Sequence, residues 1–247
     1  RKNLVMRKKL FIHGGSSLLS KYLIKKFSSE FDDFYIFCRN IEKSKKIIGV
    51  DSYSKEKIFH FFSNDLNNLE ETLKDIEKLP SDLKGIIWVT GSTGSPDQEF
   101  LDYKKAQKNI NVNFTHTVLC LTNLTNKILL EKSSFICAIT SVAGLRGRAK
   151  RLYYSAAKGG LINFMSGLRQ FYKDKIKIIT VIPGYISTNS FIEKSPEFLI
   201  TTPEKAARTI FNSIKRNEEI VYINYLWRYI MMIINLIPEK IFKKLNF

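Results

Sequence analysis

The chain has 247 residues and 44% hydrophobic content, which suits one large α/β domain with a well-buried core. Its formal charge of +17 is scattered along the whole sequence and no nucleic-acid-binding module is recognisable, so we expect a solvated basic surface and no nucleic-acid partner. The three cysteines lie in apolar segments without metal-ligand spacing, which indicates reduced core residues and no metal site in a cytoplasmic protein.

The chain alternates short apolar segments with longer amphipathic ones. Residues 1–9 are basic but lack the apolar run of a signal peptide, and no segment has the roughly 18 apolar residues of a membrane span. Buried strands are predicted over 9–13, 34–38, 58–62, 86–90, 135–140, 177–182 and 220–223. Helices are predicted over 17–28, 41–48, 67–78, 98–128 and 152–173.

This alternation predicts right-handed strand–helix–strand units. The fold class is therefore α/β, with a Rossmann-like, doubly wound parallel sheet of about seven strands and helices on both faces. Because the sequence contains no repeat, low-complexity tract or linker, residues 1–247 are expected to form a single domain.

The first predicted strand runs into a glycine turn, His13-Gly14-Gly15-Ser16-Ser17-Leu18-Leu19-Ser20. A glycine turn between a strand and a helix presents backbone N–H groups and the positive end of the helix to a pyrophosphate. The residues expected to contact a dinucleotide there are Gly14, Ser16, Ser17 and Leu19.

Three positions after later strands favour the phosphorylated dinucleotide, NADP (NADPH). An acidic residue at the end of the second strand would hold the ribose diol of NAD, but this chain has Arg39, which suits a 2′-phosphate. Asp65, after the third strand, is placed to accept a hydrogen bond from an adenine amino group. Gly91, after the fourth strand, lets the backbone approach the cofactor closely.

The most informative pattern joins Ser141, Tyr154 and Lys158. The serine lies thirteen residues before the tyrosine, and the lysine lies four residues after it, on the same face of a predicted helix. An ammonium beside a phenol favours the phenolate, so the tyrosine can exchange a proton near neutral pH. A serine at the end of a strand can hydrogen-bond an oxygen on which charge develops. The trio predicts interconversion of an alcohol and a carbonyl.

Together these motifs resemble those of the short-chain dehydrogenase/reductase family over residues 8–223. The matching stretches are the glycine turn, Asp65-Leu66, Val112-Asn113-Phe114, Ser141 … Tyr154-x-x-x-Lys158 and Pro183-Gly184-Tyr185-Ile186-Ser187-Thr188. The resemblance implies an NADP-dependent oxidoreductase acting on CH–OH groups, with a catalytic tetrad of Asn113, Ser141, Tyr154 and Lys158. It implies cofactor contacts from Tyr154 and Lys158, from Asp65 and Leu66, and from Pro183, Gly184, Ile186 and Thr188 around the nicotinamide.

The chain departs from the family pattern at two places. Leu18 and Ser20 replace two glycines of the turn, which puts the strength of cofactor binding in question. The usual Asn-Asn-Ala-Gly after the fourth strand is Trp88-Val89-Thr90-Gly91, followed by Gly94 and Asp97-Gln98. That variant, with the C-terminal tail, is similar to the reductase subunit of decaprenylphosphoryl-ribose 2-epimerase and related sugar-modifying reductases.

The C-terminal extension, residues 225–247, is apolar on nearly every side, aromatic at one end and basic at the other, with a break at Pro238. Such a segment can pack on the core, contact a partner subunit or lie peripherally on a membrane. The family resemblance also implies a homodimer or homotetramer built through the predicted helices over 98–128 and 152–173.

Two groups of polar residues are not expected to take part in catalysis. The histidines His13, His60 and His116 lack ligand spacing and are expected to be structural. The run Arg146, Arg148, Lys150 and Arg151 is expected to be solvated, although its place near the active-site rim would let it meet a substrate phosphate.

These observations favour an NADPH-dependent reductase of a small-molecule keto-sugar, phosphorylated or polyprenyl-linked, in the synthesis of cell-surface polysaccharide or glycan. One alternative is a 3-oxoacyl thioester reductase, against which the tail from Tyr225 onward counts. Another is a catalytically weak nucleotide-binding scaffold or sensor, which Leu18 and Ser20 support and the tetrad opposes.

Overall fold

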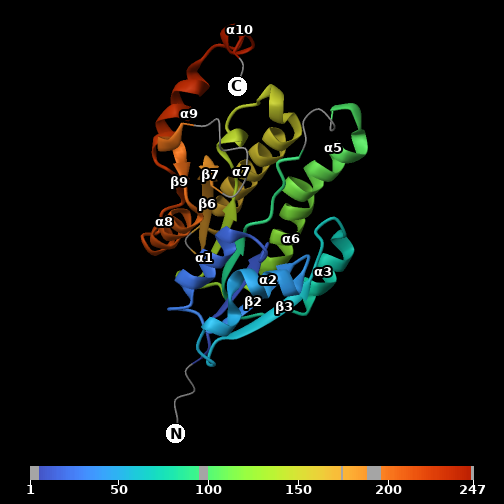
Figure 1. The fold of residues 1–247 in the computed structure, drawn as a ribbon, viewed down its shortest axis with the longest axis vertical. Helices are drawn as coiled ribbons and strands as arrows, with labels where there is room; N and C mark the ends of the chain where they lie inside the picture. The colour runs from blue at the N-terminus through green and yellow to red at the C-terminus, as the bar shows by residue number, and fades with distance from the viewer. Residues whose placement is uncertain (1–5, 95–99, 174, 188–195, 246–247) are drawn as a thin grey trace.

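The computed structural model describes residues 6–94, 100–173, 175–187 and 196–245 (Figure 1). Its main sheet has seven parallel strands in the order β3-β2-β1-β4-β5-β6-β9. These strands are β1 (Lys9–His13), β2 (Asp33–Cys38), β3 (Ile58–Ser63), β4 (Leu83–Trp88), β5 (Phe135–Ile139), β6 (Lys177–Pro183) and β9 (Ile220–Ile223). A separate parallel pair is formed by β7 (Tyr185–Ile186) and β8 (Ile200–Thr201). The predicted doubly wound α/β fold is confirmed.

The helices and short turns connect these strands in the described part of the chain. The helices are α1 (Leu18–Phe27), α2 (Ile41–Ile48), α3 (Leu69–Glu77), α5 (Tyr103–Ile110), α6 (His116–Leu124), α7 (Leu152–Tyr172), α8 (Pro203–Lys215), α9 (Leu226–Leu236) and α10 (Glu239–Phe242). The short turns are η1 (Val50–Ser52), η2 (Asn111–Thr115), η3 (Thr125–Lys127), η4 (Val142–Gly144), η5 (Ala149–Arg151) and η7 (Glu197–Leu199).

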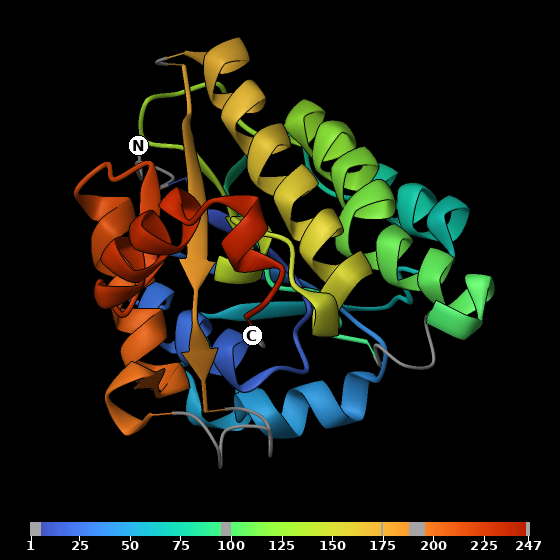
Figure 2. The ribbon, with the colours of Figure 1, turned by 90° about the horizontal axis from the view of Figure 1, so that it is seen from above.

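Helices cover both faces of the sheet (Figure 2). One core lies between the sheet and helices α1 and α8, which contribute Leu23, Ile24 and Ile210, all fully buried. The other lies under α3, α6 and α7, where Leu121 and Leu161 are fully buried. Each such aliphatic side chain stabilises the fold by roughly 1.5–3 kcal/mol relative to its exposed state, so both helical layers are held firmly to the sheet.

Three helices begin with a side-chain cap at the carboxyl ends of the strands. The side chains of Ser17, Asn40 and Asn68 accept hydrogen bonds from backbone N–H groups in the first turns of α1, α2 and α3. These three helices follow β1, β2 and β3, so their positive ends gather where those strands end. Helix α8, which was not among the predicted helices, begins in the same way, with Thr202 as cap and Pro203 in the first turn.

Strand β4 starts and ends earlier than the predicted strand over 86–90. Gly85 lies inside it, and a side chain there would meet Leu10 and Phe135 at 2.6 Å, so the neighbouring strands fill the space. After Trp88 the chain crosses the end of β1, where the Thr90 hydroxyl lies 2.5 Å from His13 Nδ1.

The helix predicted over 98–128 is interrupted in its described part. Helices α5 and α6 are joined by η2, a π-helical turn over Asn111–Thr115. The Thr117 hydroxyl donates to the backbone oxygen of Val112, five residues earlier, at 2.8 Å. Single π turns of this kind are frequent at functional sites. Here the turn contains Asn113, whose side chain is fully buried.

The C-terminal tail, residues 225–245, lies at one end of the molecule (Figure 1). On the inner side of α9, Trp227 and Met231 pack in a small core with Val142 and Ile182. Among the described residues, no helix combines the length and the apolar character that crossing a membrane requires.

Arg146 is not a solvated residue, contrary to the sequence interpretation. Its guanidinium donates to the backbone oxygens of Ile234 and Asn235 at 2.9 and 3.1 Å and pairs with Glu239 at 3.0 Å. It also lies 4.0 Å from the centre of the Phe242 ring. A cation at the end of a helix satisfies the last carbonyls and interacts well with the helix dipole, so Arg146 fixes the bend between α9 and α10.

Candidate active site

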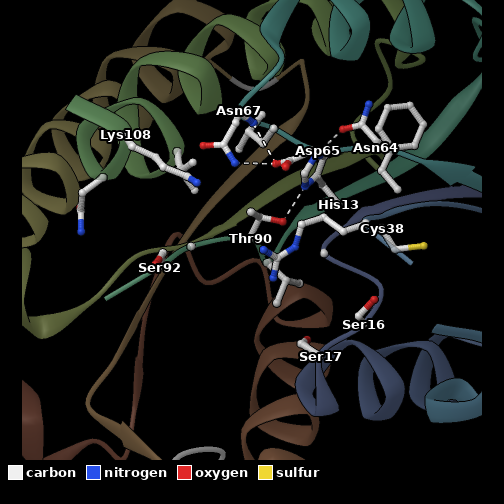
Figure 3. A pocket seen from close by; sticks show the side chains of 18 of the residues that line it. His13, Ser16, Ser17, Cys38, Asn64, Asp65, Asn67, Thr90, Ser92 and Lys108 are labelled. Carbon is white, nitrogen blue, oxygen red and sulfur yellow. Dashed lines mark hydrogen bonds between the residues drawn. The ribbon is translucent and has the colours of Figure 1, made fainter. Parts of the chain in front are cut away.

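A cavity of about 440 Å³ opens at the carboxyl ends of β1, β2, β3 and β4 (Figure 3). The strand order reverses between β1 and β4, and open parallel sheets bind ligands at such a reversal. Seven of the predicted cofactor residues line it: Gly14, Ser16, Ser17, Arg39, Asp65, Leu66 and Gly91.

The glycine turn forms one wall of the cavity. Gly14 has a φ of +99°, and a Cβ there would lie 2.8 Å from the Thr90 hydroxyl. A Cβ on Gly15 would lie 2.2 Å from an Ile36 methyl group. Both positions therefore require glycine. The Ser16 hydroxyl is buried without a hydrogen-bond partner among the described residues, and Ser16 lies on the cavity wall. A buried donor left in this state is ready to bind a polar ligand group.

The two departures from the family's glycine pattern have different consequences. The Ser20 side chain is fully buried, and its hydroxyl donates to the backbone oxygen of Gly14 at 2.8 Å, so it supports the turn from behind. Leu18 is 44% exposed and is not among the described residues of the cavity wall. Leu19 is buried in the core and is likewise absent from that described wall, so it can offer a ligand only its backbone.

The other wall carries the predicted adenine-binding residues. Asp65 accepts hydrogen bonds from the backbone and side-chain nitrogens of Asn67 at 3.1 and 2.6 Å (Figure 3). The backbone oxygen of buried Leu66 accepts from His116 Nδ1 at 2.7 Å. Sequence reasoning missed Lys105 and Lys108, which bring positive charge from α5 to the cavity. Their i, i+3 spacing on a predicted helix was the available signal.

His13 lies at the base of the cavity and is structural, as predicted. It is 3% exposed, its ring stacks on Trp88 at 4.1 Å, and its Nε2 lies 3.4 Å from Asn64 Oδ1. Burial lowers the pKa of His13 to about 4, with the hydrogen bond to Asn64 opposing that shift. The ring is therefore neutral at physiological pH.

We expect the fold to lose stability below neutral pH because of His13. Its pKa is about 4 in the folded chain and 6.5 ordinarily, so the unfolded chain takes up the extra proton first. The free energy of unfolding should fall by about 3 kcal/mol between pH 6.5 and 4 from this group alone. Urea unfolding of wild type and of His13→Gln across that range checks this. Equal pH slopes in both proteins would contradict it.

Ser141 and Tyr154 lie near each other, but none of the four predicted catalytic residues, Asn113, Ser141, Tyr154 and Lys158, is among the described residues that line the cavity. Ser141 is 9% exposed just after β5, and its Oγ accepts from the Ala143 backbone at 3.1 Å, which fixes its orientation. Tyr154, on α7, lies close enough to Ser141 for that side chain to act on its pKa. Burial raises the pKa of Tyr154, while the interaction with Ser141 and the charge of Arg151 both lower it; the expected lowering by Lys158 is not found.

Lys158 lies one helical turn beyond Tyr154 and is 2% exposed. Its Nζ donates to the backbone oxygen of Ile139 at 3.0 Å and lies 6.0 Å from the centre of the Tyr154 ring. Burial lowers the pKa of Lys158 to about 8, so the ammonium still predominates at neutral pH. A Cβ on Gly91 would lie 3.0 Å from this Nζ, so the glycine leaves the buried ammonium directly behind the cavity wall.

The Asn113 side chain is held by hydrogen bonds to two neighbouring segments. Its Oδ1 accepts from the Ser92 backbone at 3.1 Å, and its Nδ2 donates to Ser92 and Asn109 oxygens at 2.7 and 2.9 Å. The side chain thus ties the segment after β4 to the π turn. The structure brings Asn113 and Lys158 together around Gly91.

The segment predicted to flank a nicotinamide lies at the end of β6. Pro183 ends that strand, and Ile186 belongs to β7. A Cβ on Gly184 would lie 1.8 Å from Trp227 Nε1, so the indole of the tail covers this glycine directly. None of these three is among the described residues that line the cavity, and Thr188 lies outside the described residues.

Comparisons with known proteins agree with this geometry. The family model for short chain dehydrogenases matches residues 8–197. An uncharacterised oxidoreductase of Mycobacterium tuberculosis, Rv2073c, is 23% identical, with 63% of each chain covered. An acetoacetyl-CoA reductase of an Acinetobacter species is 28% identical over 61% of this chain and 62% of its own length. The matches to these two thus span less than two thirds of either relative.

Solved structures share the fold across nearly the whole chain. A short chain dehydrogenase of Burkholderia cenocepacia in complex with NADP has a TM-score of 0.77 at 16% identity, covering 96% of this chain and 97% of its own. One of Sphingobium yanoikuyae in complex with NADPH has a TM-score of 0.76 at 14% identity, covering 94% and 96%. The narrower resemblance to the epimerase reductase subunit finds no support here and stays a prediction.

Proposed function

This chain belongs to the short chain dehydrogenase family, and from that premise we propose that it is an NADPH-dependent reductase that interconverts a keto-sugar and its secondary alcohol. The supporting observation is the grouping of Ser141, Tyr154 and Lys158, with Lys158 Nζ next to Gly91 on the wall of the cavity at the strand-order reversal. NAD(P) chemistry is typical of the family, and the choice of NADPH and of a sugar is our inference.

The cavity fits a phosphorylated dinucleotide. Gly14 and Gly15 leave a cradle that any side chain would fill, and the N-terminus of α1 supplies positive charge there. The unpartnered Ser16 hydroxyl and the Arg39 guanidinium line the same cavity and suit a 2′-phosphate. When bound, the reduced nucleotide supplies the hydride for the substrate carbonyl carbon.

The side chains of this protein manage the proton. Tyr154 donates its hydroxyl proton to the substrate oxygen as negative charge develops on that atom, and Ser141 hydrogen-bonds the same oxygen. The charge of Arg151 lowers the pKa of Tyr154 and so favours the resulting phenolate, and Lys158, whose ammonium predominates at neutral pH, lies 6.0 Å from the centre of the Tyr154 ring. Asn113 holds the segment after β4 in place, so that Gly91 leaves the buried ammonium directly behind the cavity wall.

Arg39 should decide the preference for NADPH. We expect Arg39→Ala to weaken NADPH binding by roughly ten- to a hundredfold, since it removes a charged hydrogen bond to the 2′-phosphate. NADH affinity should stay within about twofold, because that nucleotide has no such phosphate. Fluorescence titration of both nucleotides measures the effect. The matched control is Lys43→Ala, because Lys43 is an exposed cation in the first turn of α2 and is not among the described residues of the cavity wall. An equal loss for both nucleotides would refute the role.

The keto-sugar assignment is supported by the basic active-site rim and by the tail. Arg151 donates to the backbone oxygens of Thr93 and Gly94 at 3.3 Å, which keeps a cation close to Tyr154. A phosphorylated or polyprenyl-linked sugar carries an anionic group that such a rim attracts. The cytoplasmic location and the homo-oligomer expected from the family remain part of this proposal.

A 3-oxoacyl thioester reductase is the second candidate. It is favoured by the resemblance to the acetoacetyl-CoA reductase and to a 3-oxoacyl-[acyl-carrier-protein] reductase of Synechocystis that is 36% identical over 81 residues. The tail, which reaches Val142 and Gly184 around the candidate site, is the feature that this candidate does not explain.

NADPH oxidation by the purified protein separates these candidates. A panel of keto-sugars, sugar phosphates and acetoacetyl-CoA should give turnover with a sugar and less with the thioester. Faster turnover with acetoacetyl-CoA would favour the second candidate. Nucleotide binding without turnover on any carbonyl would instead indicate a scaffold or sensor and would contradict the enzymatic proposal.

A further inference from the structure

The outer face of α9 is unlike that of an ordinary surface helix. Tyr225, just before the helix, and Tyr229, Met232, Ile233 and Leu236 within it are between 53% and 77% exposed. They recur at the spacing of one helical face, which in a surface helix is normally polar. The inner face is apolar too, since Trp227 and Met231 pack on the core. The outward residues are therefore not needed for folding of the tail.

The apolar face continues beyond Pro238 and is accompanied by cations. In α10 and just after it, Ile241 and Leu245 are 54% and 42% exposed. Four exposed cations accompany these residues: Arg228, Lys240, Lys243 and Lys244. The tail's one acidic residue between 225 and 245, Glu239, is paired with Arg146.

The two helices are held in a fixed arrangement. Arg146 contacts the last carbonyls of α9, the Glu239 carboxylate and the Phe242 ring at once. Its side chain is 15% exposed, so this contact is largely shielded from solvent. The apolar outer face and the lysines are therefore already arranged before any partner binds. Because the two helices need no further ordering, the conformational entropy lost on binding is small.

We propose that this face, the outward side of α9 with α10, docks the protein on an anionic membrane surface. Aromatic and aliphatic side chains entering the headgroup region, with lysines beside the lipid phosphates, are the features that hold a helix in the plane of a membrane. At 11 residues α9 is about 16 Å long, too short to cross a hydrocarbon core of about 30 Å. The proposal does not rest on the proposed reaction.

Charge favours a membrane over a second copy of the chain. Two such faces brought together would oppose four cations to four cations, in proteins that each carry a formal charge of +17. An anionic lipid surface attracts the same groups, at about 1 kcal/mol for each lysine or arginine near it. The chemistry of this surface therefore matches acidic lipids.

Co-sedimentation with lipid vesicles tests the proposal. We expect the full chain to bind vesicles of phosphatidylcholine mixed with phosphatidylglycerol, to bind pure phosphatidylcholine far less, and to release at high salt. Ile233→Asp with Leu236→Asp should weaken binding by roughly tenfold or more, because both apolar contacts are lost. Exchanging Lys240, Lys243 and Lys244 for glutamine should weaken it on the order of a hundredfold.

The matched control is Phe171→Asp, which places a charge on a 78% exposed aromatic residue of α7, outside the tail. It should bind vesicles as the wild type does. Circular dichroism and NADPH titration of each variant show whether the fold is retained, independently of turnover.

Three results would overturn the proposal. In the first, the wild type does not bind anionic vesicles. In the second, the Ile233→Asp, Leu236→Asp protein binds them as the wild type does. In the third, the Phe171→Asp control loses as much vesicle binding as that double variant. Light scattering provides a further measurement. A wild-type oligomer that the two aspartates dissociate, without any vesicle binding, would assign the face to a second copy instead.

Discussion

Replacing Tyr154 with phenylalanine is expected to lower turnover by roughly a hundred- to ten-thousand-fold. The ring and its packing on α7 are kept, and only the hydroxyl, whose pKa Ser141 influences, is lost. Without it, Ser141 can still hydrogen-bond the substrate oxygen but cannot replace the proton source. Steady-state NADPH oxidation measures the loss, and fluorescence titration should give an NADPH affinity within about threefold of wild type.

The adjacent Tyr153 supplies a matched control. It is on the same helix and loses the same atom in Tyr153→Phe, but it points along a different direction of the helix. We expect that variant to retain turnover within about twofold. Equal turnover by Tyr154→Phe and wild type would contradict the proton-donor role. Equal losses of turnover in both tyrosine variants would indicate damage to the helix instead.

Much of the sheet was predictable because buried parallel strands are continuous apolar runs. The predicted bounds of β1 and β9 match the structure, and those of β2, β3, β5 and β6 differ by one residue at one end. Strand β4 was displaced because Gly85 looks like a break in the sequence, although Leu10 and Phe135 fill the space beside it. Packing, which sequence periodicity does not report, decided that strand.

The helical layers were harder to predict than the sheet. The π turn at Asn111–Thr115 was not predicted; within it, Asn113 Nδ2 donates to the backbone oxygen of Ser92, a residue twenty-one positions earlier in the chain. Helix α8 had a readable start at Thr202 and Pro203, with apolar residues at helical spacing behind it, and was missed nonetheless.

The candidate site also contains residues that the sequence indicated and residues that it did not. Spacing indicated that Ser141, Tyr154 and Lys158 act together, and in the structure the turn η4 that follows Ser141 packs closely on α7 at Lys158 and Gly159. The contribution of Arg146 could not be read from sequence, since it depends on contacts with the last carbonyls of α9, a segment distant in the chain. Charged residues near a rim look alike until their partners are known.

A second large effect is expected from Gly144→Ala, at a residue that takes no part in proton transfer. The Cβ of alanine would meet the backbone of Lys158 at 2.6 Å and of Gly159 at 2.7 Å. Backbone atoms within a helix cannot move aside as a side chain can, so the loop after Ser141 must separate from α7. Overpacking of this kind costs about 1–3 kcal/mol of stability. The displacement between Ser141 and Tyr154 should lower turnover by roughly a hundredfold.

Two other glycines make this expectation specific. For Gly147, on the same loop, and Gly167, on α7, no atom of the described residues outside their own helix and chain neighbours lies within 4 Å of the position that an added Cβ would take. Gly147→Ala should leave stability and turnover unchanged, whereas Gly167→Ala should raise stability by about 0.5–1 kcal/mol, because alanine favours a helix interior. Urea unfolding and NADPH oxidation are compared across the three variants. If Gly144→Ala behaves like Gly147→Ala, the close approach of loop and helix does not hold Ser141 in register with Tyr154, and the geometric basis of the site fails with it.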